Sequence, residues 1–109
     1  MSEKEFRHRM SATQKSILIT LYVLSRKLPG PFEVGTIRKI INKDRCQSNF
    51  TEIQVSNFSV SCKTLFTRGL LRKFRDKNSL KVLYSLTEDG HQAAEKEYDL
   101  LVKSLSQNE

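Results

Sequence analysis

The spacing of apolar residues predicts a helix near the start of the chain. Ser11 and Gln14 have the spacing of a capping box, and Pro29-Gly30-Pro31 must end the helix. Residues 17–24 are apolar around most of the helix circumference. A helix with one solvated face would show a single apolar stripe, so we expect this helix to bury two faces, one of them against another chain. We expect residues 1–10, which precede it, to be frayed.

The segment after the prolines mixes strand and helix spacing. Phe32-Glu33-Val34 alternates as a short strand does, and three isoleucines at helical spacing predict a short helix over about 35–43. The polar stretch 42–49 has no clear period. A third helix is predicted over about 56–68, with Ser56 as its N-cap and Gly69 just beyond its end. Its inward face would consist of Phe58, Ser61, Cys62 and Leu65.

A hairpin and a last helix complete the pattern. Strands are predicted over 70–75 and 82–86, joined by residues 76–79, whose Asp and Asn favour turns. Thr87 would cap a final helix over 87–107. The sequence thus predicts one domain over residues 1–109, mainly α with a small antiparallel β-hairpin (α+β): about four helices plus a two- or three-stranded sheet.

Residues 56–90 resemble the winged helix-turn-helix of MarR- and PadR-type transcriptional regulators. In that pattern a capped recognition helix leads to Leu-x-x-x-Gly-Leu, a charged strand, a turn, and a second strand ending in Leu-Thr-x-x-Gly. The matching residues here are Leu65 to Leu70, Arg72-Lys73-Phe74-Arg75, and Leu86 to Gly90. The resemblance implies that the recognition helix, about 56–68, enters the DNA major groove. It also implies that the basic hairpin, about 70–86, is a wing lying on the phosphate backbone.

The sequence departs from this pattern between its second and third helices. A turn of a few residues usually joins them, but about a dozen residues separate Ile41 from Ser56. Either the second helix is longer than its apolar spacing indicates, or an inserted loop carries Lys43, Arg45 and Phe50.

Positive charge is concentrated in the middle of the chain. The net charge is +7, yet residues 38–86 hold eleven Lys or Arg against three Asp or Glu, and residues 87–109 hold two against six. This asymmetry predicts one surface that faces nucleic acid and an acidic element that points away from it. A generally basic protein without such a partner is the alternative.

Three groups of side chains are candidates for DNA contact. Short polar residues on the outward face of the third helix suit the major groove, although a solvated face is the alternative; they are Ser56, Asn57, Ser59, Val60, Lys63, Thr64 and Thr67. Cations in and before the hairpin suit phosphates. The alternative, lysines that protect a sheet edge from aggregation, would explain two or three of these charges but not six. The six are Arg68, Arg72, Lys73, Arg75, Lys77 and Lys81. For a second basic group the phosphate and solvent interpretations are equally open; its members are Arg38, Lys39, Lys43 and Arg45.

Apolar residues on the first and last helices predict a homodimer. The candidates are Leu18 and Tyr22 on the first helix and a stripe at 4-3-4 spacing on the last, Ala94, Tyr98, Leu101 and Leu105. The alternative is that these two helices pack against each other within one chain.

The residue sets of an enzyme or a metalloprotein are missing. His8 and His91 have no acids or cysteines at ligand spacing, and neither a phosphate-binding loop nor catalytic-triad spacing is present. We therefore expect no catalysis, no metal and no organic cofactor. A small-molecule effector is not expected either, because 109 residues leave little room for a pocket beside the DNA module.

The remaining features concern thiols and location. Cys46 is interpreted as a loop thiol and Cys62 as a small core residue, with redox sensing as the minor alternative. No apolar run approaches the roughly 20 residues that cross a bilayer. The polar start MSEKEFRHRM does not have the pattern of a secretory signal, so a cytoplasmic protein is expected, nucleoid-associated if prokaryotic.

The leading hypothesis is a dimeric, sequence-specific protein that binds double-stranded DNA, most simply a small transcriptional repressor. A winged-helix adaptor for plasmid segregation, or another architectural protein that coats repeated sites, is the first alternative. A winged helix that contacts other proteins is the second, and the balance of +8 over residues 38–86 argues against it.

Overall fold

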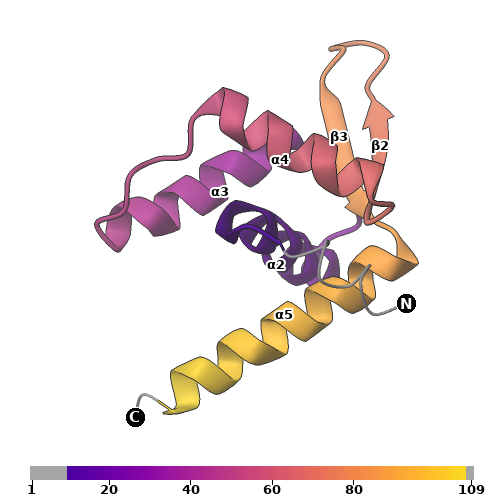
Figure 1. Ribbon diagram of the computed structural model, residues 1–109. Coiled ribbons are helices and arrows are strands. Elements are labelled where there is room, and N and C mark those ends of the chain that lie inside the picture. Colours follow the sequence, from indigo (N-terminus) through magenta and orange to yellow (C-terminus); the bar gives the residue numbers. More distant parts are fainter. Residues whose placement is uncertain (1–9, 108–109) are drawn as a thin grey trace.

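The computed structural model describes residues 10–107 of the chain (Figure 1). Four helices and three strands follow one another within that range: α2 (Ala12–Lys27), β1 (Phe32–Glu33), α3 (Val34–Gln47), α4 (Val55–Thr67), β2 (Leu71–Arg75), β3 (Val82–Leu86) and α5 (Glu88–Gln107). This order confirms the mainly helical fold with a small antiparallel sheet. The segment expected to be frayed lies outside the described residues, apart from Met10.

The three strands form one antiparallel sheet in the order β1-β3-β2. In the hairpin Leu71 pairs with Leu86 and Arg75 with Val82, while on the other side of β3 Phe32 pairs with Tyr84. The short first strand is therefore confirmed, although Val34 already belongs to α3. Because β2 and β3 are joined by a tight connection, the hairpin projects from the helices as a narrow extension (Figure 1).

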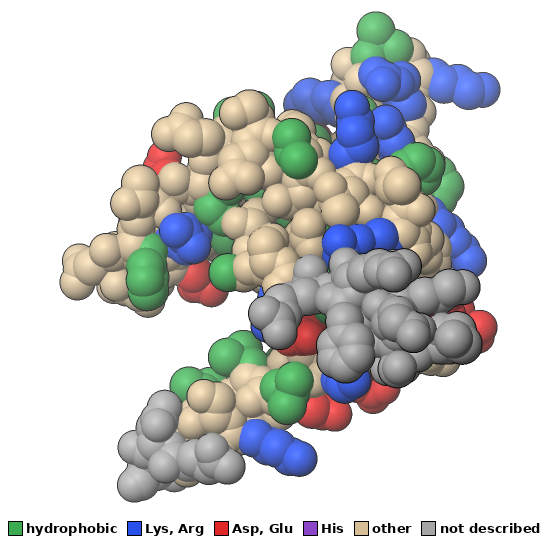
Figure 2. All heavy atoms as spheres, viewed as in Figure 1, with side chains coloured by type: hydrophobic (Ala, Val, Ile, Leu, Met, Phe, Trp, Pro, Cys, Tyr) green, Lys and Arg blue, Asp and Glu red, His purple; other side chains and the backbone are tan. Residues whose placement is uncertain are grey.

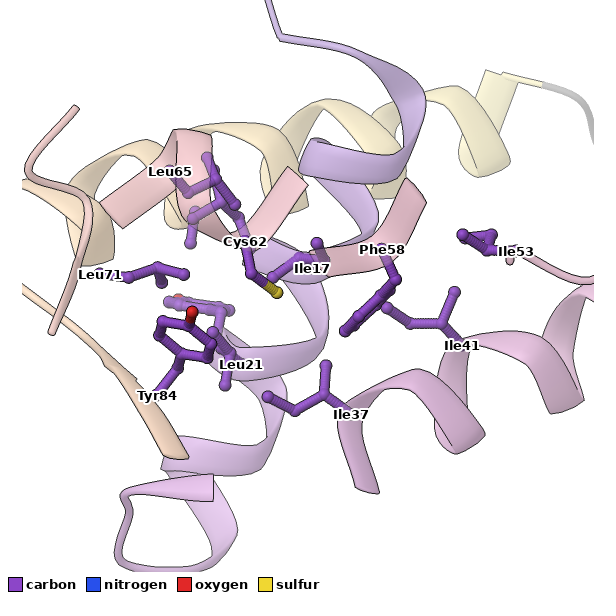
Figure 3. Close-up of a cluster of buried hydrophobic side chains, with 13 residues drawn as sticks. Ile17, Leu21, Ile37, Ile41, Ile53, Phe58, Cys62, Leu65, Leu71 and Tyr84 are labelled. Carbon is purple, nitrogen blue, oxygen red and sulfur yellow. The ribbon is translucent and has the colours of Figure 1, made fainter. Parts of the chain in front are cut away.

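Helix α2 lies at the centre of the molecule, with α3 and α4 on one side and α5 on the other (Figure 1). Ile17, Leu18 and Leu21 of α2 are completely buried. Side chains from the surrounding elements converge on them, among them Ile37, Phe58, Leu65, Leu71 and Tyr84 (Figure 3). Both apolar faces of α2 are thus used largely within its own chain.

This arrangement corrects part of the expected dimer surface. Leu18 and Ala94 are 0% exposed and Tyr22 is 7% exposed, so all three belong to the core of the single chain. They cannot contact a partner without unpacking α2 from α5. The alternative that the two helices pack on each other holds for the first half of α5.

Three sequence signals at helix ends are confirmed. Ser11 and Gln14 form the capping box, each side chain bonded to the other's backbone N–H. Gly69 has a φ of 80°, and the N–H groups of Gly69 and Leu70 donate to the carbonyls of Phe66 and Leu65, both at 3.0 Å, which is a Schellman motif. At the start of α5 the Thr87 hydroxyl accepts from Gly90 N–H at 2.9 Å.

The region between the second and third helices differs from the prediction. Helix α3 runs to Gln47, well beyond the expected end near residue 43, so the longer helix is the correct alternative. Cys46 accordingly lies on this helix, where it is exposed, and not in a loop. Helix α4 begins at Val55 with Gln54 as N-cap, so the assignment of Ser56 as N-cap is wrong.

Candidate nucleic-acid interface

Helix α4 separates its side chains as the sequence predicts. Phe58, Ser61, Cys62 and Leu65 are buried. The residues expected to face outward are exposed, apart from the half-buried Thr64: Ser56, Asn57, Ser59, Val60, Lys63 and Thr67. The polar candidates therefore lie on a solvent-facing surface, together with the exposed ring of Phe66, which the sequence analysis did not single out.

The N-terminus of α4 is open to an anion. Gln54 makes no side-chain capping bond, and the first turn contains no acidic residue. The first backbone N–H groups of a helix have no partner within the helix, and they carry the positive end of its dipole. Such an end suits a phosphate oxygen.

A set of hydrogen bonds from α3 holds the segment that leads into α4. Buried Asn42 accepts from Ile53 N–H at 2.8 Å and donates to the Ile53 carbonyl at 3.4 Å. Arg38 donates to the same carbonyl at 3.2 Å, and Arg45 Nε donates to the Thr51 carbonyl at 2.6 Å. We call these contacts the loop latch. Because Ile53 is two residues before α4, the latch ties the segment leading into that helix to α3.

The latch separates the second basic group, Arg38, Lys39, Lys43 and Arg45, into two arginines with contacts inside the fold and two exposed lysines. Arg38 and Arg45 are half-buried and bonded to backbone carbonyls, and Arg45 also lies 5.5 Å from the centre of the Phe50 ring. Lys39 and Lys43 are exposed. The two arginines thus have structural partners, and the two lysines are free to meet an anion. Asn42 was missed because it lies in the stretch that shows no clear period.

Cations cover the hairpin, and only some of them contact other residues of the fold. Lys81 pairs with Glu33 at 3.6 Å, and the Lys73 ammonium lies 5.8 Å from the centre of the Phe66 ring. Arg75 donates to the Leu80 carbonyl at 3.0 Å. Arg72 and Lys77 are exposed, and no hydrogen bond or ion pair involves their side chains within residues 10–107. We call these five cations the wing cluster.

Arg68 does not belong with them. Its side chain is half-buried and donates to the Gln14 side chain at 3.3 Å, which joins the end of α4 to the start of α2. The structure therefore gives this residue a contact within the fold, in contrast to the freely exposed Arg72 and Lys77.

Asp76 makes hydrogen bonds within the hairpin tip. Its carboxylate accepts from the Ser79 N–H at 2.9 Å and from the Ser79 hydroxyl at 2.7 Å. The hydrogen bond from the Ser79 side chain, followed by that from its backbone, lowers the pKa of Asp76. The left-handed residue of the tip is Leu80, with a φ of 61°, although Asn78 has the chemistry that tolerates this conformation.

A small hollow joins α4 to the hairpin. Its volume is about 180 Å³, and its lining includes Ser59, Cys62, Lys63, Lys73 and Tyr84. Burial raises the pKa of the Cys62 thiol to about 12. Burial, and to a lesser extent the neighbouring Cys62, raises the pKa of Tyr84. Both groups are therefore uncharged at neutral pH, and the charge around the hollow is the positive charge of its two lysines.

Positive side chains are concentrated at the hairpin, whereas acidic side chains lie on α5 and near the end of α3 (Figure 2). Blue Lys and Arg side chains gather around the projecting hairpin, and red acidic side chains lie along α5 (Figure 2). On the side away from the hairpin, α3 and α5 diverge and leave a notch (Figures 1 and 2). Two adjacent hollows, of about 230 and 170 Å³, share Ile19, Thr20 and Asp44, and Leu101 lines the larger one.

The described residues were not expected to hold a metal ion or to span a membrane. Among the described residues, no group of three or more His, Cys, Asp or Glu is placed to hold a metal ion. His8, one of the two histidines, lies outside that range. No helix within residues 10–107 is both long and apolar enough to cross a bilayer.

Comparison with solved structures identifies the class of fold. No family model and no curated protein sequence matches the chain. Solved structures do match, and they define a winged-helix fold of the kind found in MarR-type regulators, as the sequence resemblance implied. The hairpin β2–β3 is the wing, and α4 is the helix in the recognition position.

The individual neighbours are distant in sequence. A zinc-responsive MarR family member from Lactococcus lactis, ZitR, is 21% identical with a TM-score of 0.66; the match covers 92% of this chain and 59% of that one. The adhesin competence repressor AdcR of Streptococcus pyogenes is 18% identical with a TM-score of 0.69, over 98% and 67%. F-93 of SSV1 is 14% identical with a TM-score of 0.67, over 91% and 92%. This chain thus spans about three-fifths of the length of ZitR.

Proposed function

We propose that this protein binds double-stranded DNA sequence-specifically as a homodimer and acts as a small transcriptional repressor. The observation that carries the proposal is the position of the wing cluster beside the exposed polar face of α4, with the acidic residues of α5 elsewhere on the surface (Figure 2). Duplex DNA offers this combination of partners, phosphates for the cations and base edges for the short polar side chains.

The two parts of the interface would have different tasks. Asn57 and Thr64 on α4 supply hydrogen-bonding groups for base edges, and Val60, 62% exposed, offers an apolar surface to a thymine methyl. The open N-terminus of α4 and the wing cluster hold phosphates, which contribute affinity for any sequence. Lys63 of α4 and Lys73 of the wing cluster line the hollow between these two parts, where they suit phosphates of the DNA strand that runs between the major and minor grooves.

The second half of α5 and the notch beside it support a dimer. Leu101 and Leu105 are 43% and 61% exposed, and the neighbouring hollows are lined partly by isoleucines. A two-fold axis brings the same surface of two subunits together, so each α5 would pack into the partner's notch. Such a dimer would present two recognition helices, which dimeric proteins place about 34–36 Å apart on DNA.

Selection of bound sequences from random duplexes, followed by titration, tests the proposal. We expect one preferred site with two related halves, and the substitutions Asn57→Ala or Thr64→Ala should each relax the preference at one position. Loss of a base contact should cost about 1–3 kcal/mol. A single or paired site near a promoter would fit a repressor, and long arrays of repeats would fit a segregation adaptor instead. Weak binding without any preferred sequence would contradict the proposal and favour a protein-contacting role.

A further inference from the structure

We infer that Leu80 is a DNA-contacting residue of the wing, whose side chain enters the minor groove while neighbouring cations hold the flanking phosphates. The inference rests on the proposed function and adds to it a specific apolar contact. No charged or polar role explains this residue, because leucine has neither a charge nor a hydrogen-bonding side chain. Leu80 is 63% exposed at the tip of the hairpin and therefore contributes nothing to the core.

The backbone at this position favours residues other than leucine. Leu80 has a φ of 61°, a left-handed conformation that Gly and Asn adopt readily and that a bulky side chain disfavours. In the other described loop with a left-handed non-glycine residue, the position is occupied by Asn49, with a φ of 65°. An exposed leucine in such a conformation is costly to the free protein, and residues of this kind concentrate at functional sites.

Hydrogen bonds hold Leu80 in this exposed position. Its N–H donates to the Asp76 carbonyl at 2.8 Å, and its own carbonyl accepts from Arg75 at 3.0 Å. The Asp76 N–H donates in turn to the Lys81 carbonyl at 2.9 Å, which closes the tip. The side chain is thereby presented on a preorganised turn, so little further ordering is needed on binding.

The charges around Leu80 favour a polyanionic partner. Arg75, Lys77 and Lys81 surround the tip, and Asp76, the one acid in residues 70–86, is bonded to Ser79 within the turn. An apolar side chain between cations matches the minor groove, whose floor and sugars are accessible to a leucine and whose edges are phosphates.

The substitution Leu80→Asn tests the inference, because it removes the apolar side chain and relieves the left-handed strain. We expect binding to the selected duplex to weaken about tenfold, in keeping with partial burial of a leucine side chain. The melting temperature should stay the same or rise. The salt dependence of binding should not change, because no phosphate contact is lost. Leu80→Met keeps the apolar contact and should bind within about threefold of the original protein.

Leu28→Asn is the matched control. Leu28 is 57% exposed and precedes β1. Because β1 runs along β3 toward the hairpin tip, residues before β1 lie on the side away from the tip. The Leu28→Asn variant should bind the selected duplex like the original protein. If Leu80→Asn also binds like the original protein, or if its salt dependence falls, the inference is wrong. If the original protein binds no duplex, the proposed function fails as well.

A change in the DNA locates the contact. Under the wing, replacing A·T pairs by G·C adds an amino group to the minor-groove floor, whereas inosine·C pairs lack that group. The original protein should bind the G·C duplex more weakly than the inosine·C duplex, and Leu80→Asn should remove most of this difference. Equal binding of both duplexes by the original protein would place Leu80 outside the minor groove.

Discussion

Single residues in this protein acquire their properties from burial and from neighbours that are distant in sequence. Cys62 and Cys46 are the same residue type, yet the first lies on the buried face of α4 and the second lies exposed on α3. Cys62 was expected to be a small core residue, and it is one. Leu80 and Asn42 were not identified as important, because the role of each depends on a turn or a contact that the local pattern of residues does not contain.

The two thiols should react at very different rates with a thiol reagent. Burial raises the pKa of Cys62 from 9.0 to about 12, so at pH 8 its thiolate is about a thousandfold rarer than that of a thiol with a pKa of 9.0. The buried position also keeps the reagent from reaching the sulfur atom. We expect one thiol, that of Cys46, to react promptly in the folded protein and the second to react only on unfolding. Cys46→Ser should remove the fast phase. Two fast thiols in the native protein would contradict the buried position of Cys62.

The elements are held in place by a few close contacts at their ends. The Thr87 hydroxyl donates to the Gly69 carbonyl at 2.7 Å, and the Thr87 N–H donates to the Leu70 carbonyl at 3.1 Å. The start of α5 therefore lies against the turn that follows α4. This explains physically why the pattern contains Gly90: a Cβ there would overlap the carbonyl of Leu70.

Two glycine substitutions should have opposite effects on stability. Gly90→Ala forces the start of α5 away from Leu70 and should cost at least about 1–3 kcal/mol of the free energy of unfolding. Gly35→Ala meets one contact within 4 Å, the flexible Glu33 side chain at 3.2 Å, and should stabilise α3 by up to about 1 kcal/mol. Urea unfolding measures both. Equal stability of the two variants would show that α5 is not packed against this turn.

Removing the loop latch should impair recognition as well as stability. Asn42→Ala leaves the Ile53 N–H without its buried partner, which should cost about 1–3 kcal/mol. Because Ile53 positions the start of α4, the preference for the selected duplex over a scrambled one should also fall several-fold. Lys43→Ala, on the next residue of α3, should leave this preference unchanged. A less stable Asn42→Ala protein with full preference would limit the latch to a role in folding.

Most of the elements could be predicted, and the failures have physical causes. Capping residues and alternation located α2, both strands of the hairpin and the start of α5, because those signals are local. The length of α3 and the start of α4 depend on Asn42, which bonds a backbone eleven positions away. The outward face of α4 could be predicted because helical spacing is a local signal. The structural roles of Arg38 and Arg45 could not, because both bond carbonyls of a later segment.

The molecule as a whole separates three surfaces. The wing and α4 form a positively charged face, and α5 carries several acidic residues and, in its second half, exposed leucines (Figure 2). The expected stripe on α5 runs from core to surface, because Ala94 packs on α2 and Leu105 extends beyond it. A helical stripe does not reveal where its partner helix ends, so the sequence could not assign its two halves.

Leu101 and Leu105 should control dimerisation. Changing both to Glu places charge on the apolar second half of α5 without disturbing the core, since both are exposed. We expect light scattering to report twice 12.6 kDa for the original protein and 12.6 kDa for the variant, which should bind a two-half-site duplex more weakly. Lys103 lies on the opposite side of the helix from both leucines, so the control variant Lys103→Glu should remain dimeric. A monomeric original protein would contradict the dimer.

The salt dependence of DNA binding tests most directly whether the wing is a phosphate-binding surface. Each phosphate contact contributes about 0.9 to the slope of log affinity against log salt concentration. Replacing Arg72 and Lys77 by Ala should therefore lower the slope for the selected duplex by about 1.8. Replacing Lys96 and Lys103 on α5 removes the same charge and should leave the slope unchanged. If the wing variant keeps the original slope, or if the α5 variant loses as much, the wing does not hold the phosphate backbone.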